Sequence, residues 1–265
     1  MPAGDRGIFP KGCLRLMVIL KLPEEIEKAR VSNRIVAEVL SKLREKVKPG
    51  VRTKDLDKFA EEITAKRGAK PAFKGYRGFP YALCTSINEV VVHGMPSERV
   101  LIEGDIIGLD FGVYYRGFFG DATITLPVGK VAEKAAKLIA VTEQSLYRGI
   151  EQAKEGNRLG AISAAVQATV ESARFSVVRD YVGHGVGKNL HEDPQIPNFG
   201  KRDRGIELKG GMILAIEPMV NERNYRVKVL PDGWTVVTED GSLSAHFEHS
   251  VAITDNGPDI LSKLN

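Results

Sequence analysis

The sequence predicts an α+β fold built from two similar halves. Hydrophobic residues recur first at helical spacing and then in short strand-like runs, and this order occurs twice along the chain. The junction Pro49-Gly50-Val51-Arg52 before one predicted helix resembles Glu155-Gly156-Asn157-Arg158 before another. A Gly-x-Gly-x-x-Gly turn and a phosphate-binding loop are both missing from the sequence, which argues against a parallel nucleotide-binding fold. Two halves packed face to face are therefore expected.

The first half begins with two predicted helices. Pro23 starts the first helix, with acidic residues near the positive end of the helix dipole, and Pro49-Gly50 ends it. Thr53 is the expected N-cap of the second helix. Strand-like runs follow at residues 82–87, 90–92, 106–113 and 122–128.

The second half repeats this order. Helical periodicity covers residues 130–153 and 158–173, and Asn157 is the expected N-cap of the later helix. Strand-like runs lie at residues 175–178, 212–216, 234–237 and 247–254. Residues 17–265 are thus expected to form one domain with halves of about 17–128 and 129–265. Residues 1–16 are interpreted as an N-terminal extension, which is either a cloning remnant or a segment ahead of a true start at Met17.

The composition is typical of a globular enzyme of 265 residues. The net charge is +4 and the basic residues are scattered, so no dedicated nucleic-acid site is expected, although a weak attraction to a ribosome surface stays open. The two cysteines, Cys13 and Cys84, cannot form a disulfide framework or a four-thiolate zinc site. The apolar run at 16–20 is too short for a membrane span or a signal peptide. We expect a cytoplasmic protein, and nothing in the sequence demands more than a monomer.

Asp110 and Asp121 each interrupt an apolar strand-like run, and Arg116-Gly117 between them is typical of a turn. A hairpin would bring both carboxylates to one face of the sheet at nearly the same level. Two adjacent carboxylates repel each other, so they need a shared cation or a shared proton. The alternative is that both are ordinary aspartates in turns at strand ends.

His184 lies in a glycine-rich segment, Gly183-His184-Gly185-Val186-Gly187. The glycines would allow close approach of backbone or ligand, and neutral histidine is a common metal ligand. A structural histidine with satisfied hydrogen bonds is the alternative. All five histidines of the chain lie in segments that contain glycine, proline or carboxylates, which favours a shared site.

Glu217 closes the apolar strand-like run 212–216 and is followed by proline, and Glu248 begins the run that ends at Thr254. A carboxylate in such surroundings is unfavourable unless it is paired. Either glutamate alone could be a buried salt-bridge partner.

Together, two aspartates, two glutamates and one histidine form a ligand set suited to two divalent ions such as Mn, Fe or Co, with Zn also possible. Two ions roughly 3.5–4 Å apart can share a bridging water or hydroxide as the nucleophile. This chemistry indicates hydrolysis of an amide, an ester or a phosphate.

The sequence resembles the type I methionine aminopeptidase family, which has the "pita-bread" metallopeptidase fold. The resemblance extends from about Pro23 to the C-terminus and is closest in these stretches: Ser86-Ile87-Asn88-Glu89-Val90-Val91-Val92-His93-Gly94, Asp110 with Asp121, 183–187, His191-Glu192, Ile216-Glu217-Pro218 and Phe247-Glu248-His249. Cysteine- and histidine-rich N-terminal zinc modules and the helical insertion of type II members are missing from this sequence. The resemblance thus implies the compact bacterial-like form, which removes the initiator methionine from nascent polypeptides with a small second residue.

The resemblance also implies individual roles. Asp110 would chelate one metal, Asp121 and Glu248 would bridge both, and His184 and Glu217 would complete the second site. Glu217 would also relay a proton, while His93 and His191 would bind substrate and stabilise the tetrahedral oxygen or the leaving amine. The positions matching the methionine pocket are apolar or aromatic, although without the resemblance they could be ordinary core: Phe73, Tyr76, Phe79, Cys84, Leu190 and Trp234.

Two other functions are compatible with the same fold. A prolyl-directed peptidase or creatinase-like hydrolase of the same fold usually carries a sizeable extra N-terminal domain, whereas only about 20 residues precede the first predicted helix here. A non-enzymatic binding module of this fold typically lacks metal ligands, whereas all five positions are intact here. Both functions are therefore disfavoured.

Overall fold

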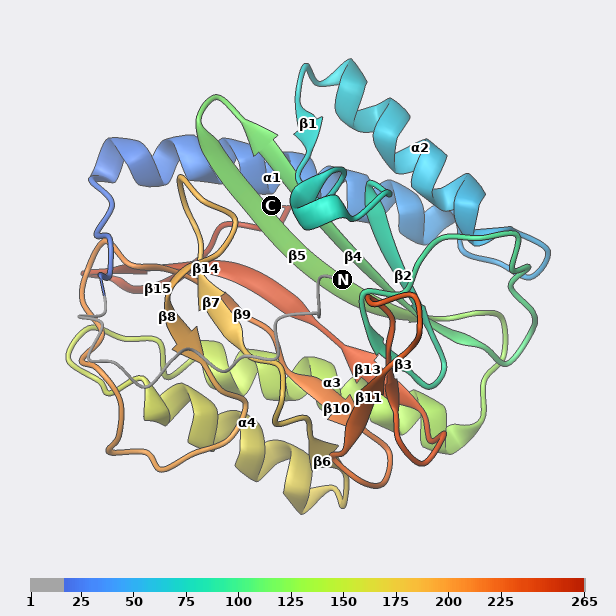
Figure 1. Ribbon diagram of the computed structural model, residues 1–265. Helices are drawn as coiled ribbons and strands as arrows, with labels where there is room; N and C mark the ends of the chain where they lie inside the picture. The colour runs from blue at the N-terminus through green and yellow to red at the C-terminus, as the bar shows by residue number, and fades with distance from the viewer. Residues whose placement is uncertain (1–16, 265) are drawn as a thin grey trace.

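The computed structural model describes residues 17–264, so the expected extension at 1–16 lies outside the described residues. Figure 1 shows a sheet that runs between two pairs of helices. One pair is α1 (Pro23–Lys46) and α2 (Thr53–Lys66), and the other is α3 (Glu133–Ile150) and α4 (Gly160–Ser172). The predicted α+β class and the repeated order of helices and strands are confirmed. No helix within 17–264 is both long and apolar enough to cross a membrane.

A large, mainly antiparallel sheet joins strands from both halves in the order β1-β4-β5-β14-β9-β7-β8, with β2 added on β4 and β15 on β14. Two small sheets, β13-β10-β6 and β11-β12-β3, flank it. The strands are β1 (Lys70–Pro71), β2 (Leu83–Ile87), β3 (Val90–Val92), β4 (Ile106–Tyr115), β5 (Phe118–Pro127), β6 (Ser176–Val177), β7 (Gly183–Gly185), β8 (Glu192–Ile196), β9 (Ile213–Ile216), β10 (Met219–Asn221), β11 (Val227–Val229), β12 (Val236–Thr238), β13 (Ser244–His246), β14 (Glu248–Thr254) and β15 (Gly257–Ile260).

The predicted hairpin around Arg116-Gly117 is present as β4 and β5, the long green strands of Figure 1. Both turn residues have positive φ angles, and Gly117 adopts its φ of 91° without the steric penalty of a side chain. β5 also pairs with β14, so the two halves meet within one sheet rather than across a separate interface.

The resemblance between the two Gly-containing junctions extends to their hydrogen bonds. Gly50 N–H donates to Leu101 O at 2.8 Å, and Leu101 N–H donates back to Val51 O at 2.8 Å. At the equivalent place, Gly156 N–H donates to Leu208 O at 3.0 Å and Leu208 N–H donates to Asn157 O at 2.8 Å. The same local pairing thus precedes α2 and α4. We propose on this basis that 17–128 and 129–265 are structurally equivalent halves.

The predicted caps of α2 and α4 are wrong. Thr53 is the first helical residue, and its hydroxyl accepts the N–H of Ser97 instead of capping the helix. Asn157 precedes α4 by three positions, and its side-chain amide donates to Gln152 O. In each case the side chain binds a neighbouring loop, a competing partner that a local pattern does not reveal.

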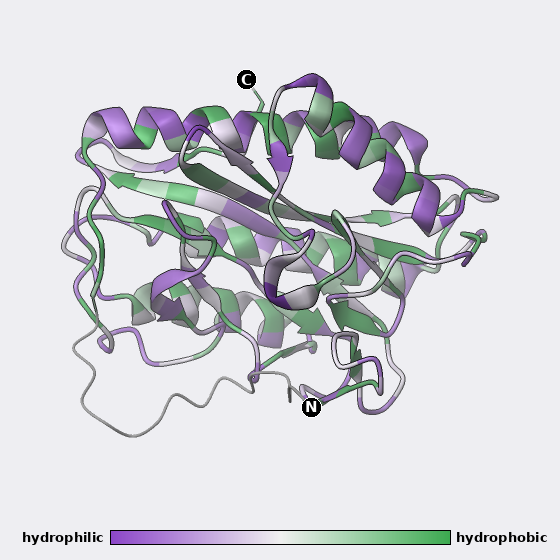
Figure 2. Ribbon diagram, turned by 45° about the horizontal axis from the view of Figure 1, so that its top comes forward, coloured by the Kyte–Doolittle hydropathy of each residue, from purple (hydrophilic) through white to green (hydrophobic). Residues whose placement is uncertain are grey.

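Helix α1 packs closely on the central hairpin. Hydrophilic and hydrophobic bands alternate along α1 in Figure 2, as expected for a helix with one buried face. The buried side includes Val36, Val39 and Leu43, which join a core with strands β2, β4 and β5. At Gly120 the approach is so close that an added Cβ would lie 2.7 Å from the backbone nitrogen of Asn33. The absence of a side chain at Gly120 is therefore what lets α1 lie against β5.

We predict that Gly120→Ala lowers the free energy of unfolding by about 1–3 kcal/mol, because the methyl group would push on helix backbone that cannot move aside easily. Denaturant unfolding measures the change. Gly108→Ala in the same hairpin is the control, since its added Cβ would come no closer than 3.4 Å to any neighbour. Equal effects of the two substitutions would contradict the close packing of α1 on Gly120.

Candidate functional site

Two of the predicted metal ligands lie in one row across the sheet. Asp110 on β4 is paired with Thr123 on β5, and Thr123 is paired with Glu248, the first residue of β14. The Thr123 hydroxyl donates a hydrogen bond to Glu248 Oε2 at 3.0 Å. Cys84 on β2 continues the row on the other side of Asp110. Paired residues share one face of a sheet, so both carboxylates point to the same side.

Asp121 lies on this face as well. It is paired with Gly112, two positions along β4 from Asp110, so the two aspartates are diagonal neighbours and not directly opposite. The predicted shared face is therefore confirmed, with a displacement of two residues along the strands. Asp121 is also the nearer of the two to the second half, because it lies on β5, which pairs with β14.

The second half supplies His184 and Glu217. His184 on β7 is paired with Ala215, and Glu217 directly follows β9, where Ile216 is paired with His249. This register brings Glu217 beside Glu248. The His184 Nε2 atom lies 3.5 Å from Glu217 Oε1 and 4.0 Å from Asp121 Oδ2.

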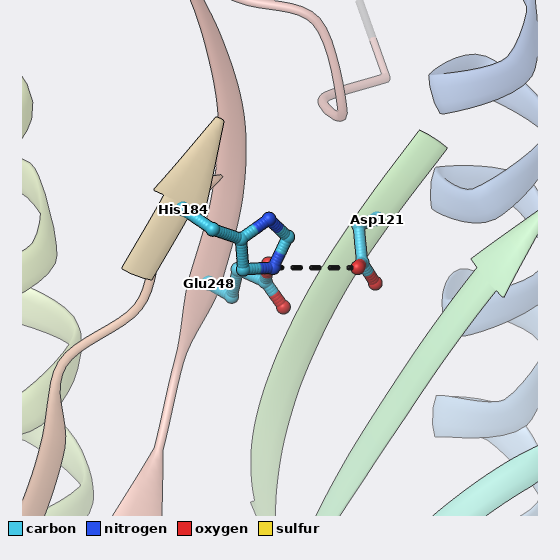
Figure 3. A group of neighbouring side chains, drawn as sticks. All are labelled: Asp121, His184 and Glu248. Carbon is cyan, nitrogen blue, oxygen red and sulfur yellow. Dashed lines mark ion pairs between the residues drawn. The ribbon is translucent and has the colours of Figure 1, made fainter. Parts of the chain in front are cut away.

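Figure 3 shows Asp121, His184 and Glu248 converging on one point from three strands. One ligand atom of each lies within 4.8 Å of those of the other two, a spacing that suits a metal ion. The three side chains are buried, and Asp121 Oδ1 and Glu248 Oε1 have no hydrogen-bond partner. Buried carboxylate oxygens without partners are strongly unfavourable, whereas a bound cation would satisfy them. The residues present therefore fit a divalent metal.

The electrostatics lead to the same conclusion. Burial raises the pKa values of Asp121, Glu217 and Glu248 well above the usual carboxyl range, and repulsion between neighbouring carboxylates adds to the increase. Burial also raises the pKa of Asp110. The pKa of His184 is lowered to about 4 by burial, which keeps the imidazole neutral and able to bind metal. Without positive charge this cluster disfavours its own ionised form.

His246 is a member of the site that the sequence did not assign. It is buried on β13, and its Nε2 atom lies 3.5 Å from Glu217 Oε2. The Thr125 hydroxyl donates to the backbone carbonyl of His246 at 2.6 Å, and the His246 N–H donates back to that hydroxyl at 3.0 Å. The sequence feature that could have suggested His246 is that it is one of the five histidines that lie near glycine, proline or carboxylates. Its spacing of two residues from Glu248 did not show that both side chains reach one site, because β13 and β14 belong to different sheets.

A cavity of about 180 Å³ opens above the carboxylates. The five predicted ligands, His93, His191 and all six predicted pocket residues line it: Phe73, Tyr76, Phe79, Cys84, Leu190 and Trp234. The rings of Phe79 and Trp234 meet edge to face with centroids 5.2 Å apart. Arg77 and Val92 also line the cavity and were not predicted. Their positions in the sequence could have suggested them, because Arg77 lies between the predicted pocket residues Tyr76 and Phe79, and Val92 directly precedes His93.

His93 and His191 face this cavity from opposite halves. His93 follows β3 with a φ of 58°, an uncommon conformation for a residue with a side chain and one that is enriched at functional sites. His191 precedes β8, stacks on Tyr76 and shares a hydrogen bond of 2.9 Å between its Nδ1 atom and the Tyr76 hydroxyl. Burial lowers the pKa of His93 to about 4. Both rings are thus held at the edge of the metal-ligand cluster.

Comparison with known proteins agrees with this geometry. The profile of metallopeptidase family M24 matches residues 27–255. The methionine aminopeptidase of Clostridium perfringens is 54% identical over 94% of this chain and 100% of its own length, and that of Escherichia coli is 44% identical over 93% and 94%. The crystal structure of methionine aminopeptidase from Thermotoga maritima superposes with a TM-score of 0.92 at 50% identity, over 94% of this chain and 100% of that one.

The fold and the buried Asp/His/Glu cluster are those of a metallopeptidase with the pita-bread architecture. The chain belongs to metallopeptidase family M24 and, within it, to the methionine aminopeptidases.

The prolidases share only the fold. The prolidase of Pyrococcus furiosus superposes with a TM-score of 0.75 at 24% identity. The match covers 93% of this chain but 66% of the prolidase, so about a third of the prolidase has no counterpart in it.

We predict that Asp121→Asn stabilises the metal-free protein while it weakens metal binding. Removing one of the crowded charges should raise the free energy of unfolding by at least about 1 kcal/mol, the equivalent of roughly one pKa unit. Affinity for Mn²⁺ or Co²⁺ should fall by more than the roughly 10- to 100-fold typical of outer-shell changes. Denaturant unfolding and calorimetric titration measure the two effects.

Asp105→Asn is the matched control. Asp105 is equally buried, but it accepts hydrogen bonds from the Arg99 guanidinium at 3.1 Å and from the Ile102 N–H at 3.0 Å. Its substitution should destabilise the protein by about 1–3 kcal/mol and leave metal affinity unchanged. If Asp121→Asn behaved like Asp105→Asn, the crowding of charges at Asp121 would be refuted.

Proposed function

We propose that this protein hydrolyses the N-terminal methionine from polypeptides whose second residue is small, and that two divalent metal ions serve the reaction. The observation that carries the proposal is the cluster of buried, mutually repelling carboxylates with His184 at the floor of an apolar, aromatic cleft. The membership in the methionine aminopeptidases supplies the substrate class.

The metal ligands divide naturally between the two halves. Asp110 lies at the first-half end of the cluster, and His184 with Glu217 lies at the second-half end. Asp121 and Glu248 lie between them, which suits ligands shared by two ions. We propose Co, Mn, Fe or Zn as the ions, since carboxylates with one imidazole fit these metals. When bound, such ions supply a water nucleophile at neutral pH and polarise the scissile carbonyl.

Glu217 is the proposed proton carrier of the reaction. Its pKa is raised well above the usual range by burial and by Asp110, so it can hold a proton at a pH where an exposed glutamate cannot. Its two carboxylate oxygens lie 3.5 Å from the Nε2 atoms of His184 and His246. Asn198 fixes the backbone here by donating to Glu217 O at 3.1 Å. The carboxylate is thus placed to take a proton from the nucleophile and pass it to the leaving amine.

His191 is proposed to hydrogen-bond the substrate through Nε2. Its Nδ1 atom already faces the Tyr76 hydroxyl at 2.9 Å. When Tyr76 donates this hydrogen bond, the ring proton of the neutral imidazole lies on Nε2. The pKa of His191 is lowered to about 3, first by its removal from solvent in the cleft and then by His184 and Arg77. The ring therefore stays a neutral donor throughout the physiological range.

His93 is proposed to stabilise the oxygen that becomes negative in the tetrahedral intermediate. Its ring packs edge to face against Tyr181 and Trp234, with centroids 5.9 and 6.2 Å away. A donor held this rigidly needs little reorganisation when charge develops.

The aromatic part of the cleft fits the methionine side chain. Phe79, Trp234 and Leu190 offer apolar surface next to the carboxylates, and thioether side chains pack well against aromatic rings. A small second residue is proposed because His93 and His191 restrict the space beside the carboxylate cluster.

We further propose that the enzyme acts as a monomer in the cytoplasm on nascent chains, with only weak contact to the ribosome.

We predict metal-dependent release of methionine from Met-Gly and Met-Ala peptides, and little or none from Met-Leu or Xaa-Pro peptides. The metal-stripped protein should be inactive and should recover with Mn²⁺, Fe²⁺ or Co²⁺. Released methionine is quantified by chromatography. Cleavage of Xaa-Pro peptides would instead indicate a prolyl-directed peptidase. Inactivity with every metal would favour the alternative of a non-enzymatic binding module.

We predict that His93→Ala lowers kcat about 100- to 1,000-fold, as loss of one preformed donor typically does. Metal affinity should stay within a few-fold of the unsubstituted protein. Asp110→Ala is the contrasting variant, because it should lose both metal binding and turnover while remaining folded. Steady-state kinetics and metal titration of both variants distinguish a role of His93 in turnover from a role in metal binding. Loss of metal from His93→Ala would show that His93 is a metal ligand.

A further inference from the structure

The segment from Met17 to Leu22 lies against the loop that carries His191. The Met17 backbone N–H donates to the Asp193 carboxylate at 3.2 Å. Lys21 is tied to the core by its own backbone N–H, which donates to Gly211 O at 2.7 Å. The segment is thus held at both ends before α1 begins.

Lys21 forms a deeply buried ion pair outside the cleft. Its Nζ atom lies 2.5 Å from Glu192 Oε2, and the two side chains are only 3% and 2% exposed. Nζ also donates to Ile19 O at 2.9 Å. The other carboxylate oxygen of Glu192 accepts the backbone N–H of Asn189 at 3.1 Å. Both charges are therefore paired and hydrogen-bonded, as buried charges require.

Gly187 leaves space for the lysine side chain. An added Cβ at Gly187 would lie 2.4 Å from Lys21 Cε and 2.9 Å from Glu192 Oε1, so a side chain at that position would displace the ion pair. The Gly187 carbonyl accepts the Phe119 N–H at 2.8 Å, which ties this point to the start of β5. Gly187 thus lies between the lysine stem and the start of β5.

The Glu192 carboxylate also holds the two ends of a short loop segment that carries two residues of the cleft. Asn189 and Glu192, which the Glu192 carboxylate holds together, flank Leu190 and His191 in sequence. Leu190 and His191 both line the cleft, and His191 stacks on Tyr76. Since Glu192 is covalently next to His191, a shift of its carboxylate would move the imidazole.

We propose that Lys21 is a positioning residue for peptide hydrolysis: through Glu192 it fixes the loop that presents His191 and Leu190 to the substrate. The inference rests on the proposed function, because it takes the role of His191 from there. Lys21 itself does not line the cleft and touches no metal ligand.

The test is a double-mutant cycle between Lys21→Met and His191→Ala, measured as kcat/KM for Met-Ala peptide hydrolysis by the metal-loaded enzyme. Methionine keeps an unbranched stem beside Gly187 and removes only the charge. We expect Lys21→Met alone to lower kcat/KM about 10- to 100-fold, in keeping with the effect of a small misplacement. In the His191→Ala background it should have almost no further effect, because a residue that acts through His191 cannot act when that ring is gone.

A second measurement does not depend on activity. In the metal-free protein, the histidine ring signal that disappears in His191→Ala should shift or broaden in Lys21→Met. Lys188→Met is the matched control on the same loop: Lys188 is 60% exposed and pairs with Glu25 at 2.6 Å, so both kcat/KM and the His191 signal should be unchanged. If Lys21→Met does not fold, Lys21→Met/Glu192→Gln removes both charges and enters the same cycle.

The outcomes separate the two proposals. No methionine release by the unsubstituted enzyme would overturn the proposed function itself. An active enzyme in which the loss from Lys21→Met is the same with or without His191 would overturn the positioning role alone. A loss confined to thermal stability, with kcat/KM intact, would also overturn it.

Discussion

Mutual repulsion among four buried carboxylates is the constraint on which the rest of this structure depends. Asp110, Asp121, Glu217 and Glu248 lie together at the cleft, where burial raises the pKa of all four and repulsion from neighbouring carboxylates adds to the increase at Asp121, Glu217 and Glu248. Such a cluster is stable only when the surrounding fold holds it in place and positive charge compensates it. The core packing, the glycine contacts and the ion pairs around it can be understood as the means of holding it.

The two-half architecture supplies the necessary geometry. Each half contributes strands to one continuous sheet, and the pairing of β5 with β14 places ligands from both halves within a few ångströms of one another. The substrate cleft follows the same division. Tyr76 and His93 come from the first half, while His191 and Trp234 come from the second, so the cleft exists only when the halves are packed together.

Rigidity around the cluster is distributed among several contacts. Tyr76 holds His191 through a hydrogen bond, Tyr181 and Trp234 pack edge to face on His93, and the buried Lys21 pairs with Glu192 beside His191. None of these contacts involves a metal ligand. In the proposed mechanism, these are the contacts at which a substitution changes turnover without changing metal binding.

The sequence alone determined the α+β class, the central hairpin and the carboxylates that line the cleft, while the resemblance to a family supplied the apolar and aromatic residues. Carboxylates inside apolar runs are unfavourable unless paired, and this local fact made Asp110, Asp121, Glu217 and Glu248 stand out. The helix caps at Thr53 and Asn157 were mispredicted because other backbone groups compete for those side chains: Ser97, 44 residues away, for Thr53, and Gln152, five residues away, for Asn157. Tertiary structure decided the diagonal register of the two aspartates, the inclusion of His246 and the burial of Lys21 against Glu192. Each depends on which strands lie side by side, and pairing between distant segments leaves no trace in local periodicity.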